Sequence, residues 1–461
     1  MARTILIAGI FAGAVVFRCV ADALFTFQKD TGYRGIWYFN QPTNDEYVYK
    51  YSGGLGTYCA KHIPLAVYAP EAEKTFFVYG GKKLGQRSLL AMASYYDHRT
   101  GSVPRPTIVI DKKTDDAHDN PVISLDDGGY IWVFASSHGT ARPSYIFRSK
   151  SPYAIDDFDR VRETNFSYPQ PWYISGEGFL FLHTRYEGGR VLHWMTSPDG
   201  VTWSQGAPLA FIDQGHYQVS WRHGTKVGTA FNYHPNGLGL NYRTNLYYVE
   251  THDMGNTWRN ARGEPVKVPV CTVSNAALVH DYAADGLKVY LKDLNFDAEG
   301  CPVILHLTSK GWEPGPENGP REWRVAHWTG ETWMIYTVTT SDNNYDTGSL
   351  YIEDDGMWRV IGPTETGQEP FNPGGEVAVW TSDDRGKTWI KQRQLTSDSP
   401  YNHTYVRRPL DAHPGFYALW ADGHARRPSE SRLYFYDKTA DRVMRLPYHM
   451  EEDFAPPEPL E

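Results

Sequence analysis

Short runs in which apolar and polar residues alternate recur along the chain, separated by clusters of Gly, Asp, Asn and Pro. Clear examples are Gly129–Ala135, Gly178–His183, Arg243–Val249 and Glu331–Thr337. An alternation of period two predicts strands with one buried face, and the aromatic and β-branched residues in these runs also favour strands. Long helical periodicity is missing from the sequence. The pattern therefore predicts an all-β fold.

A turn motif that ends in Trp occurs three times, at Ser197–Trp203, Thr251–Trp258 and Ser382–Trp389. Each copy resembles an Asp-box. We expect its Asp to accept hydrogen bonds from backbone amides of a hairpin turn, its Gly to take a positive φ, and its Trp to pack between neighbouring sheets. Three such hairpins favour a β-propeller. They also assign a structural role to the Asp of each copy: Asp199, Asp253 and Asp384.

The chain of 461 residues can be accommodated in one propeller. Once residues 1–23 are set aside, there is room for about seven four-stranded blades of roughly 60 residues each. We therefore predict a single domain, a seven-bladed β-propeller over residues 24–450. The acidic, proline-rich tail 451–461 is expected to be a frayed terminus.

Residues 1–23 have the features of a secretory signal peptide. Arg3 precedes an apolar run, Ile5–Phe17, and the small residues Ala21 and Ala23 mark a cleavage site. The apolar run is shorter than the ~20 residues that a membrane-spanning helix needs. Cleavage after Ala23 and a secreted or periplasmic location are predicted, with a buried N-terminal helix or strand as the alternative.

Composition and charge narrow the choice of partners. Aromatic residues make up 15% of the chain, unlike disordered or coiled-coil proteins, which are poor in them. The net charge of −9 provides no global positive field for nucleic acid or an anionic membrane. We expect neither as a partner, and any anionic ligand would need a local cluster of cations.

Several polar residues with rings lie in loops beside predicted strand ends, where a propeller binds its ligands. His118 and His138 lie about one hairpin apart and could meet at one mouth of the central channel. Tyr168 is held extended by Pro169, and Arg185 closes the following strand. A Tyr and an Arg there offer a proton-transfer group and a bidentate carboxylate clamp. The alternative is structural, with each His satisfying backbone groups and Tyr168 contacting Arg185.

Other residues of the later loops are candidates for substrate binding, through aromatic stacking or positive charge. They are Tyr217, Arg222, Tyr233, His234 and Arg321.

Three soft-ligand residues, Cys271, His280 and Cys301, could be brought together by one blade as a structural zinc site. Two buried thiols, or a disulfide between Cys271 and Cys301, are the alternatives.

At these residues the chain resembles the Asp-box propellers of the ulvan lyases, polysaccharide lyase families 24 and 25. The resemblance covers most of the chain. It rests on Gly32–Trp37, Tyr49–His62, the loops of His118 and His138, Tyr168–Gln170, Phe231–Pro235, Gly315–Arg321 and Trp420–His424.

The resemblance implies a lyase that cleaves the 4-O-linkage to a uronate in sulfated, rhamnose-containing ulvan by β-elimination, leaving a 4,5-unsaturated uronate. By motif, Arg185 would bind the carboxylate, while Tyr168 and His118 or His138 would share base and acid duty. We expect a monomer that requires no cofactor for the chemistry, with a structural zinc or calcium ion left open. A sialidase- or rhamnosidase-like hydrolase and a non-catalytic glycan-binding propeller are the alternatives.

Overall fold

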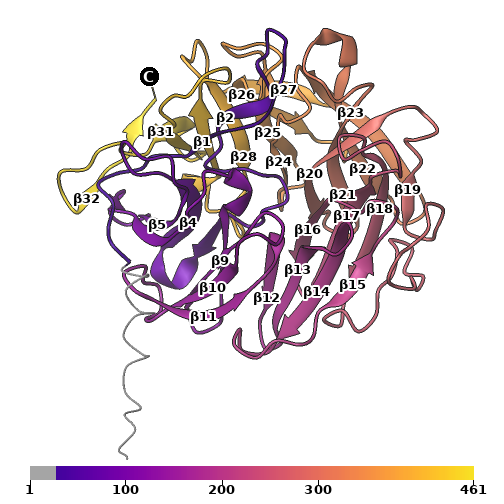
Figure 1. Cartoon of the computed structure of the whole chain (residues 1–461), viewed down its shortest axis with the longest axis horizontal. Helices are drawn as coiled ribbons and strands as arrows, with labels where there is room; N and C mark the ends of the chain where they lie inside the picture. Colours follow the sequence, from indigo (N-terminus) through magenta and orange to yellow (C-terminus); the bar gives the residue numbers. More distant parts are fainter. Residues whose placement is uncertain (1–26, 461) are drawn as a thin grey trace, which may run out of the picture.

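The computed structural model describes residues 27–460, so the predicted signal peptide lies outside the described residues. Within this range seven sheets of four or five antiparallel strands follow one another along the chain. Figure 1 shows them fanned around a common centre. The predicted all-β, seven-bladed propeller is confirmed.

Each blade takes its strands from consecutive chain segments, and the first strands of neighbouring blades pack against one another for much of the ring. The first blade is formed by β3 (Ala66–Ala69), β4 (Lys74–Gly81), β5 (Leu90–Asp97) and β7 (Thr107–Asp111); the second by β8 (Pro121–Leu125), β9 (Ile131–Ala135), β10 (Ser144–Ser149) and β11 (Phe158–Thr164); and the third by β12 (Ser167–Ile174), β13 (Gly178–Tyr186), β14 (Arg190–Ser197) and β15 (Ala207–Ala210). The fourth blade is formed by β16 (Gln218–His223), β17 (Lys226–Tyr233), β18 (Thr244–Thr251) and β19 (Leu278–His280), and the fifth by β20 (Lys288–Phe296), β21 (Pro302–Ser309), β22 (Arg321–Trp328) and β23 (Trp333–Ser341). The sixth blade is formed by β24 (Ser349–Ile352), β25 (Trp358–Glu365), β26 (Glu376–Ser382) and β27 (Ile390–Gln394), and the seventh by β28 (Asn402–Arg407), β29 (Ala418–Gly423), β30 (Leu433–Asp437), β31 (Arg442–Arg445) and β33 (Glu458–Pro459).

Two further pairs of short strands complete the described sheets: the hairpin β1 (Trp37–Pro42) with β2 (Tyr49–Gly54), and β6 (Val103–Pro104) with β32 (Phe454–Ala455). The helical segments are single 3-10 turns: η2 (Pro70–Ala72), η3 (Ala117–Asp119), η4 (Pro316–Asn318) and η5 (Pro414–Phe416). None of the helices in residues 27–460 has the length and apolar character needed to cross a bilayer.

The ring closes where the two ends of the chain meet. The amides of Tyr33 and Gly35 donate to the carbonyls of Pro447 and Ser431 in the last blade, and the Ile36 amide donates to Gly80 in the first. In Figure 1 the indigo and yellow segments accordingly lie side by side. The N-terminal segment thus joins the first blade to the seventh.

The tail does not fray as predicted. Its strand β33 pairs with β31 at the outer edge of the seventh blade, and β32 pairs with β6 of the first-blade region. An edge strand needs few amide donors, so the Pro residues of this segment are compatible with pairing. The prolines and acidic residues were misread as a signal for a free terminus.

The Asp-boxes have the predicted turn geometry. Asp384 accepts hydrogen bonds from the amides of Lys387 and Thr388 at 3.0 and 2.9 Å. Gly386 has φ 81°, and a Cβ there would lie 2.7 Å from the ring of Trp358. Only glycine satisfies both the positive φ and this close approach.

The Trp residues of the boxes pack between blades, as predicted. The ring of Trp203 lies 6.2 Å from that of Phe134 in the second blade, and the rings of Trp258 and Trp194 are 5.4 Å apart across the third and fourth blades. Much of the aromatic content of the chain is core of this kind.

Candidate active site

Residues that can transfer protons or bind charged groups meet in a cavity of about 720 Å³. It lies where the innermost strands begin: Tyr168 is near the start of β12, Tyr217 directly precedes β16, and Tyr345 precedes β24. The hairpin β1–β2 adds Lys50 to the wall. Because each blade contributes the same end of its inner strand, residues far apart in sequence converge on this one mouth.

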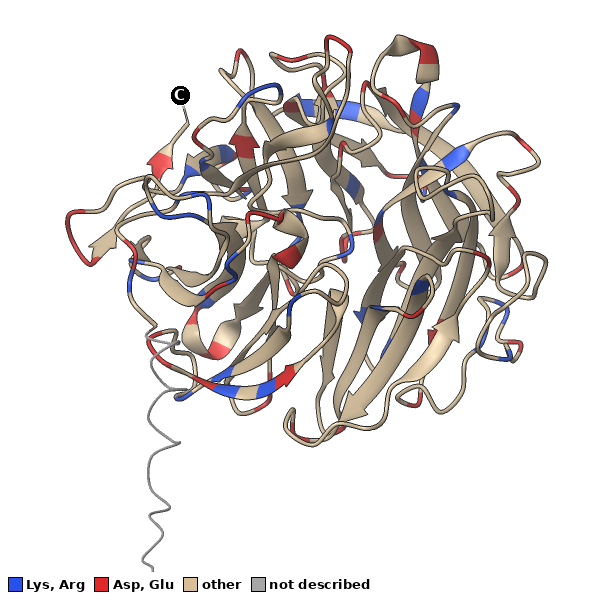
Figure 2. Ribbon diagram, in the orientation of Figure 1, with Lys and Arg blue, Asp and Glu red and all other residues tan. Residues whose placement is uncertain are grey.

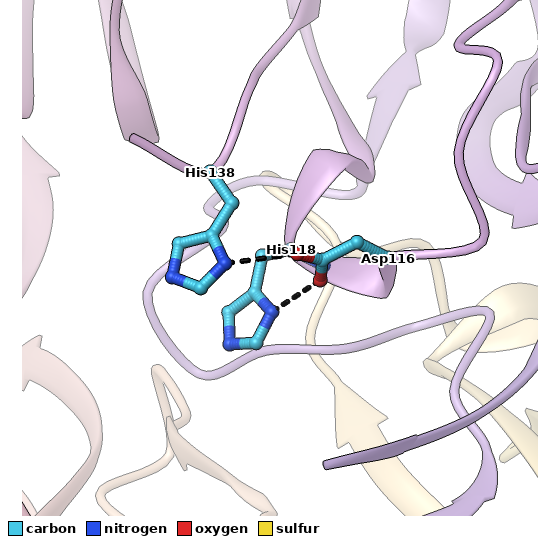
Figure 3. Close-up of side chains that lie close together, drawn as sticks. All are labelled: Asp116, His118 and His138. Carbon is cyan, nitrogen blue, oxygen red and sulfur yellow. Dashed lines mark hydrogen bonds and ion pairs between the residues drawn. The ribbon is translucent and has the colours of Figure 1, made fainter. Parts of the chain in front are cut away.

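The two predicted histidines meet here. His118 is part of η3, whose N-cap residue Asp116 accepts a hydrogen bond from the His118 amide. His138 follows β9, and the two imidazole rings stack with centroids 4.0 Å apart and an angle of 17° between their planes. Figure 3 shows Asp116 beside both rings. The prediction that one hairpin would bring the two residues together is confirmed geometrically.

One carboxylate serves both rings. Asp116 Oδ1 lies 2.5 Å from His118 Nδ1, and Oδ2 lies 2.9 Å from His138 Nδ1. Although burial opposes ionisation, the attraction of His118 and the hydrogen bonds from both rings hold the pKa of Asp116 well below its usual range. Asp116 is therefore a carboxylate.

Two tyrosines cover the far side of His118. Its Nε2 lies 2.7 Å from the hydroxyl of Tyr58 and 3.0 Å from that of Tyr51. Burial lowers the pKa of His118 to about 4, although the charge of Asp116 acts in the opposite direction. At neutral pH this imidazole is neutral and can accept a proton.

Tyr168 lies between the histidines and Tyr217, with ring centroids 6.2 Å from His118, 6.4 Å from His138 and 5.4 Å from Tyr217. Its φ of 53° places a non-glycine residue in the left-handed region, in a break in the β12–β13 register. Such strain is found at functional positions. Burial, followed by the neighbouring tyrosines, raises the pKa of Tyr168 well above its ordinary value. It keeps its proton at neutral pH.

The walls of the cavity are strongly basic. They carry Lys50, Lys61, Arg190, Arg243 and Lys292, and no Asp or Glu is among the lining residues of the described chain. Arg190 is only 8% exposed and Arg243 only 4%. Nε and Nη1 of Arg190 and Nε of Arg243 are buried and make no hydrogen bond within residues 27–460. Buried donors without partners are costly, and here they belong to two arginines that line the cavity.

These cations act on Tyr217. Burial alone would raise its pKa, but the surrounding positive charges, led by Arg190 and Arg243, lower it to about 8. The guanidinium carbons of Arg190 and Arg243 lie 5.1 and 4.7 Å from the centre of its ring. Tyr217, predicted as a substrate-binding residue, does line the cavity.

Arg185 does not reach the cavity. Its side chain, 45% exposed, forms an ion pair with Glu187 at 3.0 Å. Side chains alternate along β13, so Arg185 points away from the face that carries Tyr186, whose ring lies 6.0 Å from that of His138. The arginine in the cavity is Arg190, which begins the next strand.

The other predicted substrate-binding residues lie outside the cavity lining. Arg222 is at the other end of β16 and pairs with Asp411 at 2.9 Å. The Arg321 guanidinium donates to the carbonyls of Glu313 and Gly315 and so holds their loop. Tyr233 and His234 are buried behind the wall, with the ring of His234 5.1 Å from that of Tyr217.

The predicted metal ligands are not brought together. Cys271 is exposed in the loop between β18 and β19, His280 binds Asp285 at 2.7 Å, and Cys301 lies in the β20–β21 turn of the next blade. All three cysteines in the described chain are free, so the disulfide alternative is wrong. In residues 27–460, Asp116, His118 and His138 are the residues whose ligand atoms come close enough to hold a metal ion. The Nδ1 atoms of His118 and His138 already hydrogen-bond to the Asp116 carboxylate.

None of the five basic residues that line the cavity was predicted from the sequence as a site residue. Lys50 and Lys61 fall within Tyr49–His62, a segment that carries the family resemblance. Nothing near them in the sequence indicated that the two lysines would line a site. Arg190 and Arg243 each precede or open a strand. Each follows a tyrosine, Tyr186 in the case of Arg190 and Tyr242 in the case of Arg243, and this was the available signal.

The opposite mouth of the channel is larger and chemically different. A cavity of about 1500 Å³ is lined there by the other ends of the inner strands. Its cations are paired: Arg222 with Asp411, Arg408 with Asp293 at 3.4 Å, and Lys438 with Glu353 at 2.5 Å.

Comparison with known proteins places the chain in a family. Residues 90–341 match the BNR repeat-containing family, and the chain belongs to it. It is 23% identical over 330 residues to an ulvan lyase of Nonlabens ulvanivorans, a match covering 61% of this chain and 66% of that protein. The chain thus spans just under two thirds of the length of this relative.

Solved structures share the whole fold. A polysaccharide lyase PL25 ulvan lyase superposes with a TM-score of 0.71 at 17% identity, covering 89% of this chain and 96% of the other. A second structure of a PL25 ulvan lyase, bound to -[GlcA(1-4)Rha3S]-, gives a TM-score of 0.70 at the same identity and coverage. The resemblance noted from the sequence is confirmed.

Proposed function

We propose that this member of the BNR repeat-containing family is a polysaccharide lyase that cleaves the 4-O-linkage to a uronate in ulvan by β-elimination. The names of its relatives support this substrate. The observation that carries the proposal is the cavity: five basic residues, tyrosines and a histidine pair, with no carboxylate among its described lining residues.

The first requirement of the reaction is to stabilise negative charge. The C5 proton of a uronate is a weak acid, and its removal builds charge on the adjacent carboxylate. We assign the carboxylate to Arg190, because its unpartnered Nε and Nη1 can make charge-assisted hydrogen bonds there. Nε of Arg243 adds a third unpartnered donor. The role predicted for Arg185 moves to Arg190.

The second requirement is a pair of proton-transfer groups. His138 is partly exposed, and its Nε2 makes no hydrogen bond within the described residues, so we assign it as the base, with His118 behind it. Tyr168 keeps its proton and is assigned as the acid that protonates the departing O4. Tyr217 hydrogen-bonds the substrate carboxylate in its neutral form.

The same cavity argues against hydrolysis. Most glycoside hydrolases use a pair of Asp or Glu residues beside the scissile bond, and none lines this cavity in the described chain. A pure binding module would have no need for strained and unpartnered groups such as Tyr168. We further propose that the protein acts as a secreted or periplasmic monomer and that its chemistry requires no cofactor.

The test is to incubate the purified protein with ulvan and follow the ultraviolet absorbance of a 4,5-unsaturated uronate. A rise in step with new reducing ends is expected. New reducing ends without absorbance would establish a hydrolase instead. Binding without any release of product would establish a glycan-binding propeller.

A further inference from the structure

The contacts of Asp116 determine which ring nitrogen of each histidine carries the proton, as well as where the two rings lie. An ionised carboxylate only accepts hydrogen bonds, and each of its oxygens lies within hydrogen-bond distance of one Nδ1. Both Nδ1 atoms must then carry the proton. In a neutral imidazole this leaves Nε2 as the acceptor. Figure 3 shows the two Nδ1 atoms directed toward Asp116.

The surroundings of Nε2 agree with this tautomer. The hydroxyl of Tyr58 or that of Tyr51 can donate to Nε2 of His118. Nε2 of His138 has no partner in the described chain and belongs to a side chain that is 27% exposed. Each ring thus offers its basic nitrogen on the side away from Asp116.

The stacking adds a constraint on charge. Two protonated rings would place like charges face to face at 4.0 Å, and Asp116 supplies one compensating charge for the pair. The other charged and titratable groups around the pair are Arg142, 3.8 Å from Asp116, Asp119, which Arg142 binds at 2.9 Å, and Tyr38, Tyr51, Tyr58, His62, Tyr168 and Tyr186.

We propose that Asp116 is the positioning residue of the site: it fixes both histidines as Nδ1–H tautomers, so that each ring presents an unprotonated Nε2. This inference rests on the proposed function for its kinetic consequence alone. A base that takes the C5 proton must present an unprotonated nitrogen, and Asp116 ensures that whichever ring faces the substrate does so.

The substitution Asp116→Asn separates tautomer control from packing. An amide has almost the same shape, but one of its two polar atoms is an NH₂ donor. One ring would keep its Nδ1–H bond to the amide oxygen. The other would face the NH₂ group, which requires Nδ1 as acceptor and moves the proton to Nε2. Asp115→Asn is the matched control, because Asp115 is the neighbouring residue, 46% exposed, and pairs with Arg87.

The measurement is nitrogen NMR of the full chain with ¹⁵N-labelled histidine rings, with signals assigned through His118→Gln and His138→Gln. The wild type and Asp115→Asn should show both rings as Nδ1–H tautomers. Asp116→Asn should convert one of the two rings to Nε2–H. Nε2–H on both rings of the wild type, or unchanged tautomers in Asp116→Asn, would overturn the proposal.

Kinetics provide the second readout. On ulvan, Asp116→Asn should lower kcat by at least about a hundredfold, the usual contribution of a positioned base, with KM within about threefold of the wild type. Asp115→Asn should leave both unchanged. If the wild type does not cleave ulvan, the proposed function fails, while the NMR result still decides the role of Asp116. If the wild type cleaves ulvan and Asp116→Asn keeps full kcat, the positioning role is wrong.

Discussion

The two mouths of the propeller are built from opposite ends of the same strands, yet they differ in whether their basic side chains have carboxylate partners. At the wider mouth each cation named above has a carboxylate partner, as in the pair of Arg222 and Asp411. At the narrower mouth Arg190 and Arg243 are more deeply buried, and no carboxylate of the described chain lines the cavity beside them. Figure 2 shows most acidic residues in the loops and turns. Unpaired, buried charge is costly to a fold, so it distinguishes the mouth where we propose that the anionic substrate binds.

The largest effect on activity is expected when one arginine is removed from each mouth in turn. Arg190→Ala should lower kcat/KM on ulvan by about a thousandfold, because charge on the uronate would lose its main partner. Arg190→Lys should recover part of this loss. Arg222→Ala, the control at the opposite mouth, should stay within twofold. Equal losses in Arg190→Ala and Arg222→Ala would erase the distinction between the mouths.

The next effect concerns proton transfer at the narrow mouth. Tyr168→Phe and His138→Ala should each reduce turnover by at least about a hundredfold. Tyr173→Phe is the control, since Tyr173 lies on the same strand β12 but its hydroxyl binds Asp127 at the other end. Initial rates of absorbance increase measure all three. Near-full activity in either of the first two variants would remove that residue from the mechanism.

A smaller effect is expected from pH. Tyr217, with a pKa of about 8, is neutral below that pH and negatively charged above it. Its phenolate would compete with the substrate carboxylate for Arg190, so kcat/KM should fall as the pH rises through about 8. Tyr217→Phe should move this alkaline limb upward by more than one pH unit. A rate that rises through pH 8 and is lost in Tyr217→Phe would make Tyr217 the base instead.

The Asp-boxes should affect stability and leave catalysis intact. Asp384→Ala removes acceptors for two turn amides and should lower the free energy of unfolding by about 1 to 2 kcal/mol. Urea denaturation measures the loss, and activity on ulvan should remain within twofold. A large loss of activity at unchanged stability would contradict the structural role.

The smallest effect should come from chelation. The cations and proton-transfer groups assigned here are side chains, so dialysis against EDTA should leave both activity and Tm unchanged. A loss that zinc or calcium restores would show that a metal supports the site or the fold.

The sequence was sufficient for the fold because the blade pattern is local. An Asp-box places its acceptor, its Gly and its Trp within one hairpin, so Asp384 and Trp389 could be interpreted without any knowledge of the rest of the chain. The histidine pair was predictable for the same reason, since His118 and His138 flank a single hairpin.

The cation cluster was not predictable in this way. Lys50 and Arg243 come from the N-terminal hairpin and the fourth blade, and closure of the ring brings them to one cavity. Arg185 and Arg190 lie on either side of one turn, and the direction of each side chain, which the sequence did not reveal, decides between them. The apparent zinc ligands failed similarly, because Cys271 and Cys301 belong to different blades.

The most direct test of the account is a crystal structure of the Tyr168→Phe variant with an ulvan tetrasaccharide. We expect a uronate in the narrow mouth, its carboxylate on Arg190 and Arg243, and its C5 carbon facing Nε2 of His138. A sugar chain bound at the opposite mouth, or a carboxylate held by Arg185, would contradict it.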